Sequence, residues 1–252
     1  MRILLQSKFE MNQILHIDQI HNILATGEIE ITGRFMWGSN YTFLVEVKNL
    51  QETIAAVYKP SRGERPLWDF PRATLAAREV AAYLTSQSLG WKLVPPTVLR
   101  QDGPAGSGSL QYYVDAEVEH HYFTFSEPEK QRLRHVALFD ILINNADRKG
   151  GHVLMSPDDH IWSIDHGVCF HHHNKLRTVI WDFACEPIPE TLLRDTEGFY
   201  EKLLSDDVLE ERYLDLLSEE EFIALKNRTR LVLEDPFYPE PLSDRPYPWP
   251  LV

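Results

Sequence analysis

The first half of the chain shows the two-residue alternation of polar and apolar side chains that is typical of half-buried β-strands. Three such runs follow one another, at residues 28–32, 41–47 and 53–59. Turns at residues 33–40 and 49–52 separate them. The pattern therefore predicts a meander of three strands, preceded by a short helix over residues 18–25 that ends at Gly27.

A helical period replaces the alternation over residues 72–89, which are followed by Gly90. Four side chains recur at spacings of 4, 7 and 8 and so share one helix face: Leu75, Glu79, Ala82 and Tyr83. Glu79 therefore lies within an apolar stripe, where an unpaired carboxylate is costly to bury. We expect Lys59, at the end of the third predicted strand, to be its partner; the alternative is that Lys59 is a solvated strand end.

The second half of the chain is predicted to be mainly helical after a strand at residues 110–114 and a crossing segment at residues 115–124. Ser126 and Glu129 form a capping box with Pro128 between them, which indicates the start of a helix. One face of that helix carries Leu133, Val136, Ala137, Asp140, Ile141 and Asn144. We expect its inward-facing Asp140 and Asn144 to brace the loop at residues 145–151 rather than to act in catalysis.

Further helices are predicted at residues 200–204, 208–217 and 219–234. The last segment, residues 235–252, holds six prolines together with aromatic side chains. This composition favours an extended strap that packs on the body of the protein.

The stretch around Asp147 and Asp165 carries the most chemistry. The two aspartates lie 18 positions apart, and a β-hairpin is predicted between them, with a first strand at residues 152–155, a turn at 156–159 and a return at 161–164. A hairpin brings its two ends together, so both carboxylates should emerge at the same edge of the sheet. Carboxylate oxygens there are suited to divalent metal and a phosphoryl group.

Composition limits the classes of function and partner. The chain has 252 residues and a net charge of −13, which disfavours nucleic acid and anionic membranes as main partners. It contains two cysteines and no apolar run of membrane-spanning length. We therefore expect a protein of the reducing cytoplasm with no integral membrane segment.

Two other groups suggest ligands. The turn at residues 33–40 contains Ser39 and Asn40, and its backbone N–H groups are candidates to cover a phosphate. The histidines at residues 171–173 suggest zinc, but neighbouring side chains in an extended run point to opposite sides and no paired ligand spacing is present. A polar loop lining a cleft is the favoured interpretation of these histidines.

The order of these parts resembles the protein-kinase-like fold: a strand turn, a strand lysine, a helix glutamate, a loop aspartate and a second aspartate after a hairpin. The segments AVYKPSRGERPLWDFP, LAAREVAAYLTSQSLGWKLVPPTVLR, GSLQYYVD, LFDILINNADRKGGHVL and SIDHGVCF are similar to the phosphatidylinositol 3-/4-kinase branch, closest to a bacterial group of phosphatidylinositol kinase-like proteins. The resemblance spans roughly residues 25–185.

The resemblance implies a two-lobed α+β fold. A small antiparallel, β-rich N-lobe would cover residues 25–115, after an N-terminal extension and helix at 1–24. A mainly helical C-lobe with a catalytic hairpin and a Pro-rich strap would cover residues 116–252.

The resemblance also assigns expected roles. Lys59 would bind the ATP phosphates and pair with Glu79, while Ser39 and Asn40 would lie in the phosphate-covering turn. Asp147 would be the catalytic base. Arg148 would support either the catalytic loop or the γ-phosphate.

The expected metal ligands are Asp165, which would hold Mg²⁺ or Mn²⁺, and the residue five positions after the catalytic aspartate. Lipid kinases of this kind carry an Asn at that second position, and here it is His152. An imidazole ligand is more typical of softer ions than Mg²⁺. His152 therefore points to Mn²⁺, to Asp165 as the one strong ligand, or to altered chemistry.

The sequence leaves several functions open. The leading hypothesis is an ATP- and metal-dependent phosphotransferase whose acceptor is a protein or small molecule rather than a lipid. The alternatives are a catalytically impaired nucleotide-binding module (a pseudokinase), a nucleotidyl transferase on the same fold and, last, a metal-dependent hydrolase built on Asp147, His152 and Asp165.

Overall fold

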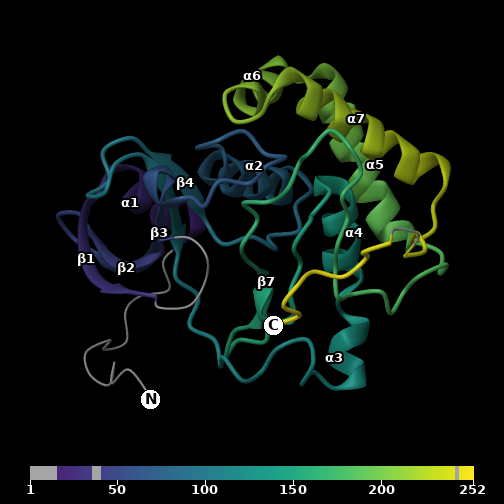
Figure 1. The fold of residues 1–252 in the computed structure, drawn as a ribbon, viewed down its shortest axis with the longest axis horizontal. Coiled ribbons are helices and arrows are strands. Elements are labelled where there is room, and N and C mark those ends of the chain that lie inside the picture. The colour runs from purple at the N-terminus through teal and green to yellow at the C-terminus, as the bar shows by residue number, and fades with distance from the viewer. Residues whose placement is uncertain (1–15, 36–40, 242–243) are drawn as a thin grey trace.

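The computed structural model describes residues 16–35, 41–241 and 244–252. Figure 1 shows a β-rich part and a helical part, with α2 between them. The strands are β1 (Glu28–Arg34), β2 (Phe43–Lys48), β3 (Thr53–Pro60), β4 (Thr97–Arg100), β5 (Gly108–Tyr112), β6 (Val153–Met155) and β7 (Ile161–Ser163). The α-helices are α1 (Ile17–Thr26), α2 (Leu75–Ser88), α3 (Glu127–Gln131), α4 (Arg134–Ile143), α5 (Glu190–Ser205), α6 (Asp207–Leu214) and α7 (Glu219–Glu234).

The first five strands form one antiparallel sheet in the order β1-β2-β3-β5-β4. The alternation in β3 decides where its side chains point: Ala56 and Tyr58 are buried against α1, whereas Lys59 faces the other way. The three-strand meander predicted from the sequence is confirmed. The sheet thus directs one lysine toward the rest of the molecule.

Two hydrophobic cores hold the fold together. One lies between α1 and the sheet, and it is formed by Ile20, Ile23, Leu24, Val45, Val47, Ile54, Ala56, Tyr58, Val98 and Leu110. The larger core belongs to the helical part and includes Phe139 of α4, Phe199 of α5 and Phe222 of α7. Ala82 and Leu84 of α2 pack in this second core. The boundary between the two lobes predicted at residue 115 stays a prediction. Helix α2 precedes that residue but packs in the core of the helical part, so hydrophobic packing joins the two sides.

The helix predicted over residues 72–89 begins later than expected, at Leu75. Ala73 has a left-handed φ of 60°, which an α-helix cannot include. The Glu64 carboxylate accepts a hydrogen bond of 3.1 Å from the backbone N–H of Ala76, so a loop side chain supplies an acceptor that the helix start lacks. The predicted apolar stripe is confirmed, because Leu75, Glu79, Ala82 and Tyr83 are all buried.

The single helix expected after Ser126 is wrong: two helices, α3 and α4, lie there. The backbone N–H groups of Arg132 and Leu133 donate to carbonyls three residues back, which tightens the chain at that point. The capping box of Ser126 and Glu129 is present at the start of α3.

The helix expected at residues 200–204 begins ten residues earlier, at Glu190. Its inner face carries Leu192, Thr196, Phe199 and Leu203. Gly198 and the polar residues around it interrupt the hydrophobic period in the sequence, and tertiary packing overrides that weak local preference.

The hairpin between the two aspartates is confirmed as the antiparallel pair β6 and β7. His152 is a correction, because it ends the short 3₁₀ helix Gly150–His152 (η2) and does not begin the strand. The strap is also confirmed: Cys185 donates a backbone hydrogen bond to Tyr238 at 2.9 Å, and Thr178 donates one to Pro246 at 3.1 Å. Within the described residues, no helix has the length and apolar character needed to cross a membrane.

Candidate active site

Lys59 joins two acidic side chains that come from distant parts of the chain. Its Nζ lies 2.5 Å from Oε1 of Glu79 on α2 and 2.9 Å from Oδ1 of Asp165, which follows β7. Burial alone would lower the pKa of Lys59, but the Asp165 and Glu79 carboxylates outweigh it and raise the pKa above its usual range. The ammonium is therefore charged, and the partner predicted for Glu79 is confirmed.

Glu79 binds a second group besides Lys59. Its Oε2 accepts a hydrogen bond of 2.9 Å from the backbone N–H of His166. The Glu79 side chain is only 4% exposed, so both carboxylate oxygens find partners away from solvent. The glutamate thus links the lysine of the sheet to the segment that follows the hairpin.

Asp165 has a left-handed backbone, with φ of 62°. That conformation is uncommon for a residue with a side chain, although Asp and Asn tolerate it better than most. The Lys59 ammonium holds the pKa of Asp165 below its ordinary value, against the opposing effect of burial. The side chain remains 46% exposed, so an ionised carboxylate is open to a ligand.

His152 reaches the other oxygen of the same carboxylate, with its Nε2 3.2 Å from Oδ2 of Asp165. Burial, assisted by nearby cations such as Arg148 and Lys149, lowers the pKa of His152 to about 4. A neutral imidazole beside a carboxylate carries its proton on the facing nitrogen, which is Nε2. The buried Nδ1 has no hydrogen-bond partner among the described residues.

Asp147 lies in the loop between α4 and η2. Its backbone N–H donates to Oδ1 of Asn145 at 2.9 Å, and its Oδ2 lies 2.9 Å from Nζ of Lys149. Burial raises the pKa of Asp147 despite the lysine, and the negative charge of Asp165 acts in the same direction. The prediction that the two carboxylates emerge at the same edge stays a prediction.

Arg148 is fully buried and ties the loop together. Its guanidinium forms a bidentate pair with Asp140 at 2.9–3.1 Å and donates to Nε2 of His166 at 2.8 Å. It also donates to the carbonyls of His152 and Ile164, at the two ends of the hairpin. With 0% of the side chain exposed, this geometry fits the loop-supporting role and is at odds with contact to a γ-phosphate.

The bracing role expected for Asp140 is confirmed, because its carboxylate also accepts a hydrogen bond of 2.9 Å from the Asn145 side-chain amide. Asn144 differs: it holds the segment after the hairpin, donating to the carbonyls of His171 and His173 at 2.8 and 2.7 Å and accepting 2.8 Å from Lys175 N–H. Its left-handed φ of 53° ends α4 and aims the amide at that segment.

Two other predicted ligand sites are not part of this group of residues. Ser39 and Asn40, the predicted phosphate-covering turn, lie outside the described residues. No group of three or more His, Cys, Asp or Glu side chains in the described part of the chain could hold a metal, so the histidines at 171–173 form no such site there. The rings of His171 and His172 instead stack, the ring of His173 is tilted against them, and Nε2 of His171 lies 3.0 Å from the Asp69 carbonyl.

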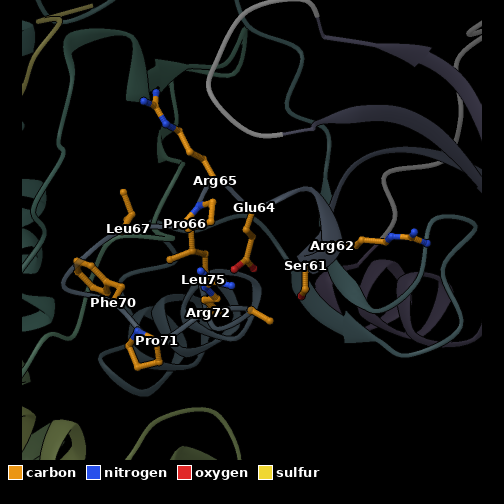
Figure 2. Close-up of a pocket in the computed structure, with 11 residues that line it drawn as sticks. Ser61, Arg62, Glu64, Arg65, Pro66, Leu67, Phe70, Pro71, Arg72 and Leu75 are labelled. Carbon is orange, nitrogen blue, oxygen red and sulfur yellow. The ribbon is translucent and has the colours of Figure 1, made fainter.

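A hollow of about 190 Å³ lies in the connection from β3 to α2. It is lined by Glu64, Phe70, Leu75 and three arginines, Arg62, Arg65 and Arg72. Figure 2 shows the side chains of Arg62 and Arg65 extending in different directions rather than converging. The arrangement is unlike an anion-binding pocket, and the candidate site residues do not line it.

The donor set can be tested against a divalent metal. Mg²⁺ in nucleotide sites is held by one or two carboxylates and by phosphate oxygens. Asp165 supplies one exposed, ionised carboxylate, which fits this pattern. His152 is the neighbouring donor, and its Nε2 can ligate a metal only after its proton moves to the unpartnered Nδ1.

The sequence reasoning missed Lys149 and Arg78. Lys149 pairs with Asp147, and its place two residues further along the same loop was an available signal. Arg78 is only 1% exposed and pairs with Glu221, 143 positions away. No local pattern connects those two residues.

The five-stranded antiparallel sheet, the helical C-terminal part and the site between them define a protein of the protein-kinase-like fold. A solved structure described as "Crystal structure of the golgi casein kinase" aligns with a TM-score of 0.58, covering 86% of this chain and 73% of that chain at 16% identity. At that identity the likeness shows the fold alone.

The chain belongs to the family of Protein Rv2133c from Mycobacterium tuberculosis (strain ATCC 25618 / H37Rv). The two are 40% identical over 268 residues, covering 92% of this chain and 95% of that protein. Phosphatidylinositol 4-kinase gamma 4 of Oryza sativa subsp. japonica is 34% identical over 143 residues, 46% of this chain and 24% of that protein. The resemblance to phosphatidylinositol kinases is thus confirmed as a distant relationship. No family model matches the chain.

Proposed function

We propose that this protein is an ATP- and divalent-metal-dependent phosphotransferase. The observation that carries the proposal is the convergence of Lys59, Glu79 and Asp165, with 2.5 and 2.9 Å contacts between elements far apart in sequence. Strongly perturbed ionisable groups gathered in one place are typical of functional sites. A structural ion pair alone would not need the exposed Asp165 carboxylate or the adjacent Asp147.

Each residue has a proposed task in the reaction. Lys59, held by Glu79, binds the phosphates of ATP. Asp165 holds the divalent metal, which when bound screens the charge of the phosphates. Asp147 orients the acceptor hydroxyl and accepts its proton as the oxygen bonds to the γ-phosphorus and the bond to ADP breaks. Arg148 acts through the loop by fixing Asp140 and His166.

The acceptor that we propose is a protein or small molecule rather than a lipid. The net charge of −13 opposes binding to anionic membranes. The Lys175 ammonium, in the segment that follows the hairpin, lies 2.7 Å from a carboxylate oxygen of Asp69, which neutralises a charge that a lipid phosphate would need. The rice relative is named for phosphatidylinositol, so the lipid stays an outcome of the test.

One observation favours a second candidate, a nucleotide-binding module without catalysis. Both oxygens of Asp165 already have partners, Lys59 and His152, so a metal must compete for this carboxylate.

A cytoplasmic location is also part of the proposal and is compatible with Cys169 and Cys185 being free thiols.

A labelling experiment tests the proposal. The protein is incubated with γ-labelled or α-labelled ATP, in Mg²⁺ or Mn²⁺, with lysate protein, a small-molecule fraction or phosphatidylinositol vesicles. Transfer of the γ label to protein or a small molecule supports the proposal, while transfer to the vesicles alone corrects the acceptor. Transfer of the α label would indicate nucleotidyl transfer. If neither label moves while ATP raises the melting temperature, the binding module is the better account.

A further inference from the structure

The helix that carries Glu79 is attached to the C-terminal part of the protein by more than hydrophobic packing. Thr85 of α2 shares a buried hydrogen bond of 2.9 Å with Tyr213 of α6. Ala81 and Tyr83 lie in the core that contains α4, α5 and α7. Helix α2 also borders β4 and β5, while Ala81, Ala82, Tyr83 and Leu84 on its buried face lie in the core of the helical part.

Arg78 forms a second, charged attachment. Its side chain is 1% exposed, its Nη2 lies 2.5 Å from Oε1 of Glu221 on α7, and its Nη1 donates to the carbonyl of Cys169 at 2.6 Å. The guanidinium also lies over the ring of Phe70, 4.8 Å from its centroid. A charge buried this deeply is stable only because its partners are fixed.

Glu79 is the next residue, and its carboxylate contacts different partners from those of Arg78. One oxygen contacts Lys59 and the other accepts the His166 N–H at 2.9 Å. Successive residues on a helix point about 100° apart, so one helical turn presents Arg78 to α7 and Glu79 to the site. The rotation of α2 about its axis therefore sets where the Glu79 carboxylate lies.

We propose that Arg78 is a positioning residue: its contacts with Glu221 and the Cys169 carbonyl hold the Glu79 carboxylate in place whether or not Lys59 contacts that carboxylate. The assignment deepens the proposed function, on which its catalytic consequence rests. In this arrangement the contact between Glu79 and His166 is held by the attachment of α2 to α7 and to the Cys169 carbonyl. Lys59 of the sheet then meets a carboxylate that is already oriented.

The amide of His166 reports the position of Glu79 without any turnover. Its exchange rate is measured by NMR in the nucleotide-free protein, for the wild type and for Arg78→Met, Lys59→Met and Thr85→Val. Arg78→Met is expected to speed His166 exchange at least about tenfold, the effect of losing a hydrogen bond of ordinary strength. Lys59→Met and Thr85→Val are expected to leave it within about threefold of the wild type.

Thr85→Val is the matched control, because it removes a buried hydrogen bond between α2 and the C-terminal helices without touching Arg78. If the wild type transfers phosphate, Arg78→Met is expected to lower kcat by a larger factor than it changes the KM for ATP. Arg78→Lys is expected to restore part of the lost kcat. Thr85→Val is expected to keep the wild-type kcat even though it lowers the melting temperature. If Arg78→Met fails to fold, Glu221→Gln removes the partner charge with little change of shape.

The outcomes separate the two claims. Protected His166 in Arg78→Met, or in Glu221→Gln where Arg78→Met does not fold, overturns the positioning role, as does equal loss of protection in Lys59→Met. If His166 loses protection in Arg78→Met but not in Lys59→Met or Thr85→Val, the positioning role is supported. If the wild type in that case transfers no phosphate, the proposed phosphotransferase function is overturned.

Discussion

The imidazole of His152 lies 3.2 Å from the Asp165 carboxylate, on the oxygen that Lys59 leaves open. The pKa of this histidine is about 4 because it is buried, so the imidazole that faces the carboxylate is neutral at physiological pH. The resemblance to lipid kinases implies a metal-binding Asn at this position, and the histidine found there lies against the carboxylate that a metal would use. A metal at Asp165 would compete with this contact for the carboxylate.

Replacing His152 by Asn should strengthen Mg²⁺ binding. An amide oxygen is a harder ligand than an imidazole nitrogen, and its use requires no proton to move. We expect His152→Asn to lower the Mg²⁺ concentration at which ATP stabilises the protein, with a smaller effect in Mn²⁺. Thermal denaturation over a Mg²⁺ and a Mn²⁺ series checks this. Equal shifts for both metals, or none, would mean that His152 plays no part in metal selection.

The same histidine should make the metal-free protein sensitive to acid. The folded state holds the pKa of His152 at about 4, against an ordinary value of 6.5, so the unfolded chain binds this proton more readily. Stability is therefore fully present above pH 6.5 and is lost as the pH falls from 6.5 to about 4, by up to about 3 kcal/mol. His152→Asn should flatten this part of the pH profile in urea unfolding with EDTA present. An identical slope in the two proteins would contradict the assignment.

Breaking the buried pair of Arg148 and Asp140 should cost much of the protein's stability. Both side chains are 0% exposed, and Arg148→Met leaves the Asp140 carboxylate without its cation, at a cost of about 3–5 kcal/mol. The exposed pair of Arg230 and Glu234 is the control, where Arg230→Met should cost no more than about 0.5 kcal/mol. Urea unfolding measures both variants. Similar losses in the two would show that Arg148 does not organise the loop.

The strap should protect the loop that carries Asp147. The backbone N–H of Gly150 donates to the carbonyl of Leu251 at 2.8 Å, while the N–H of Thr178 donates to Pro246 at 3.1 Å. Ending the chain after Pro246 removes the first acceptor and keeps the second. Amide exchange should therefore quicken at Gly150 and change little at Thr178. No change at Gly150 would mean that the strap does not hold the loop.

The site was predictable wherever its chemistry follows a local pattern. The stripe of α2 predicted that Glu79 is buried and needs a cationic partner, which is Lys59. The hairpin between Asp147 and Asp165 was likewise predicted from its turn residues. His152 shows the limit of such reasoning: the strand period assigned it to β6, although the glycines before it close a 3₁₀ turn instead.

Contacts without a sequence period could not be predicted. The partners Arg78 and Glu221 lie 143 positions apart, and their pairing depends on how α2 and α7 pack. The break between α3 and α4 and the early start of α5 were missed for a related reason, since tertiary contacts decide them against weak local preferences.

In the proposed reaction, Asp147 accepts the proton of an acceptor hydroxyl during phosphoryl transfer from ATP. The most direct test is the rate of γ-label transfer by the wild type and by Asp147→Asn, with ATP affinity measured for both. We predict that the wild type transfers the label and that the variant binds ATP normally but is slower by a factor of about 10²–10⁴, the usual contribution of a general base. In the wild type the rate should fall as the pH drops through the pKa of Asp147, which burial raises. Label transfer at an unchanged rate in Asp147→Asn would contradict the account.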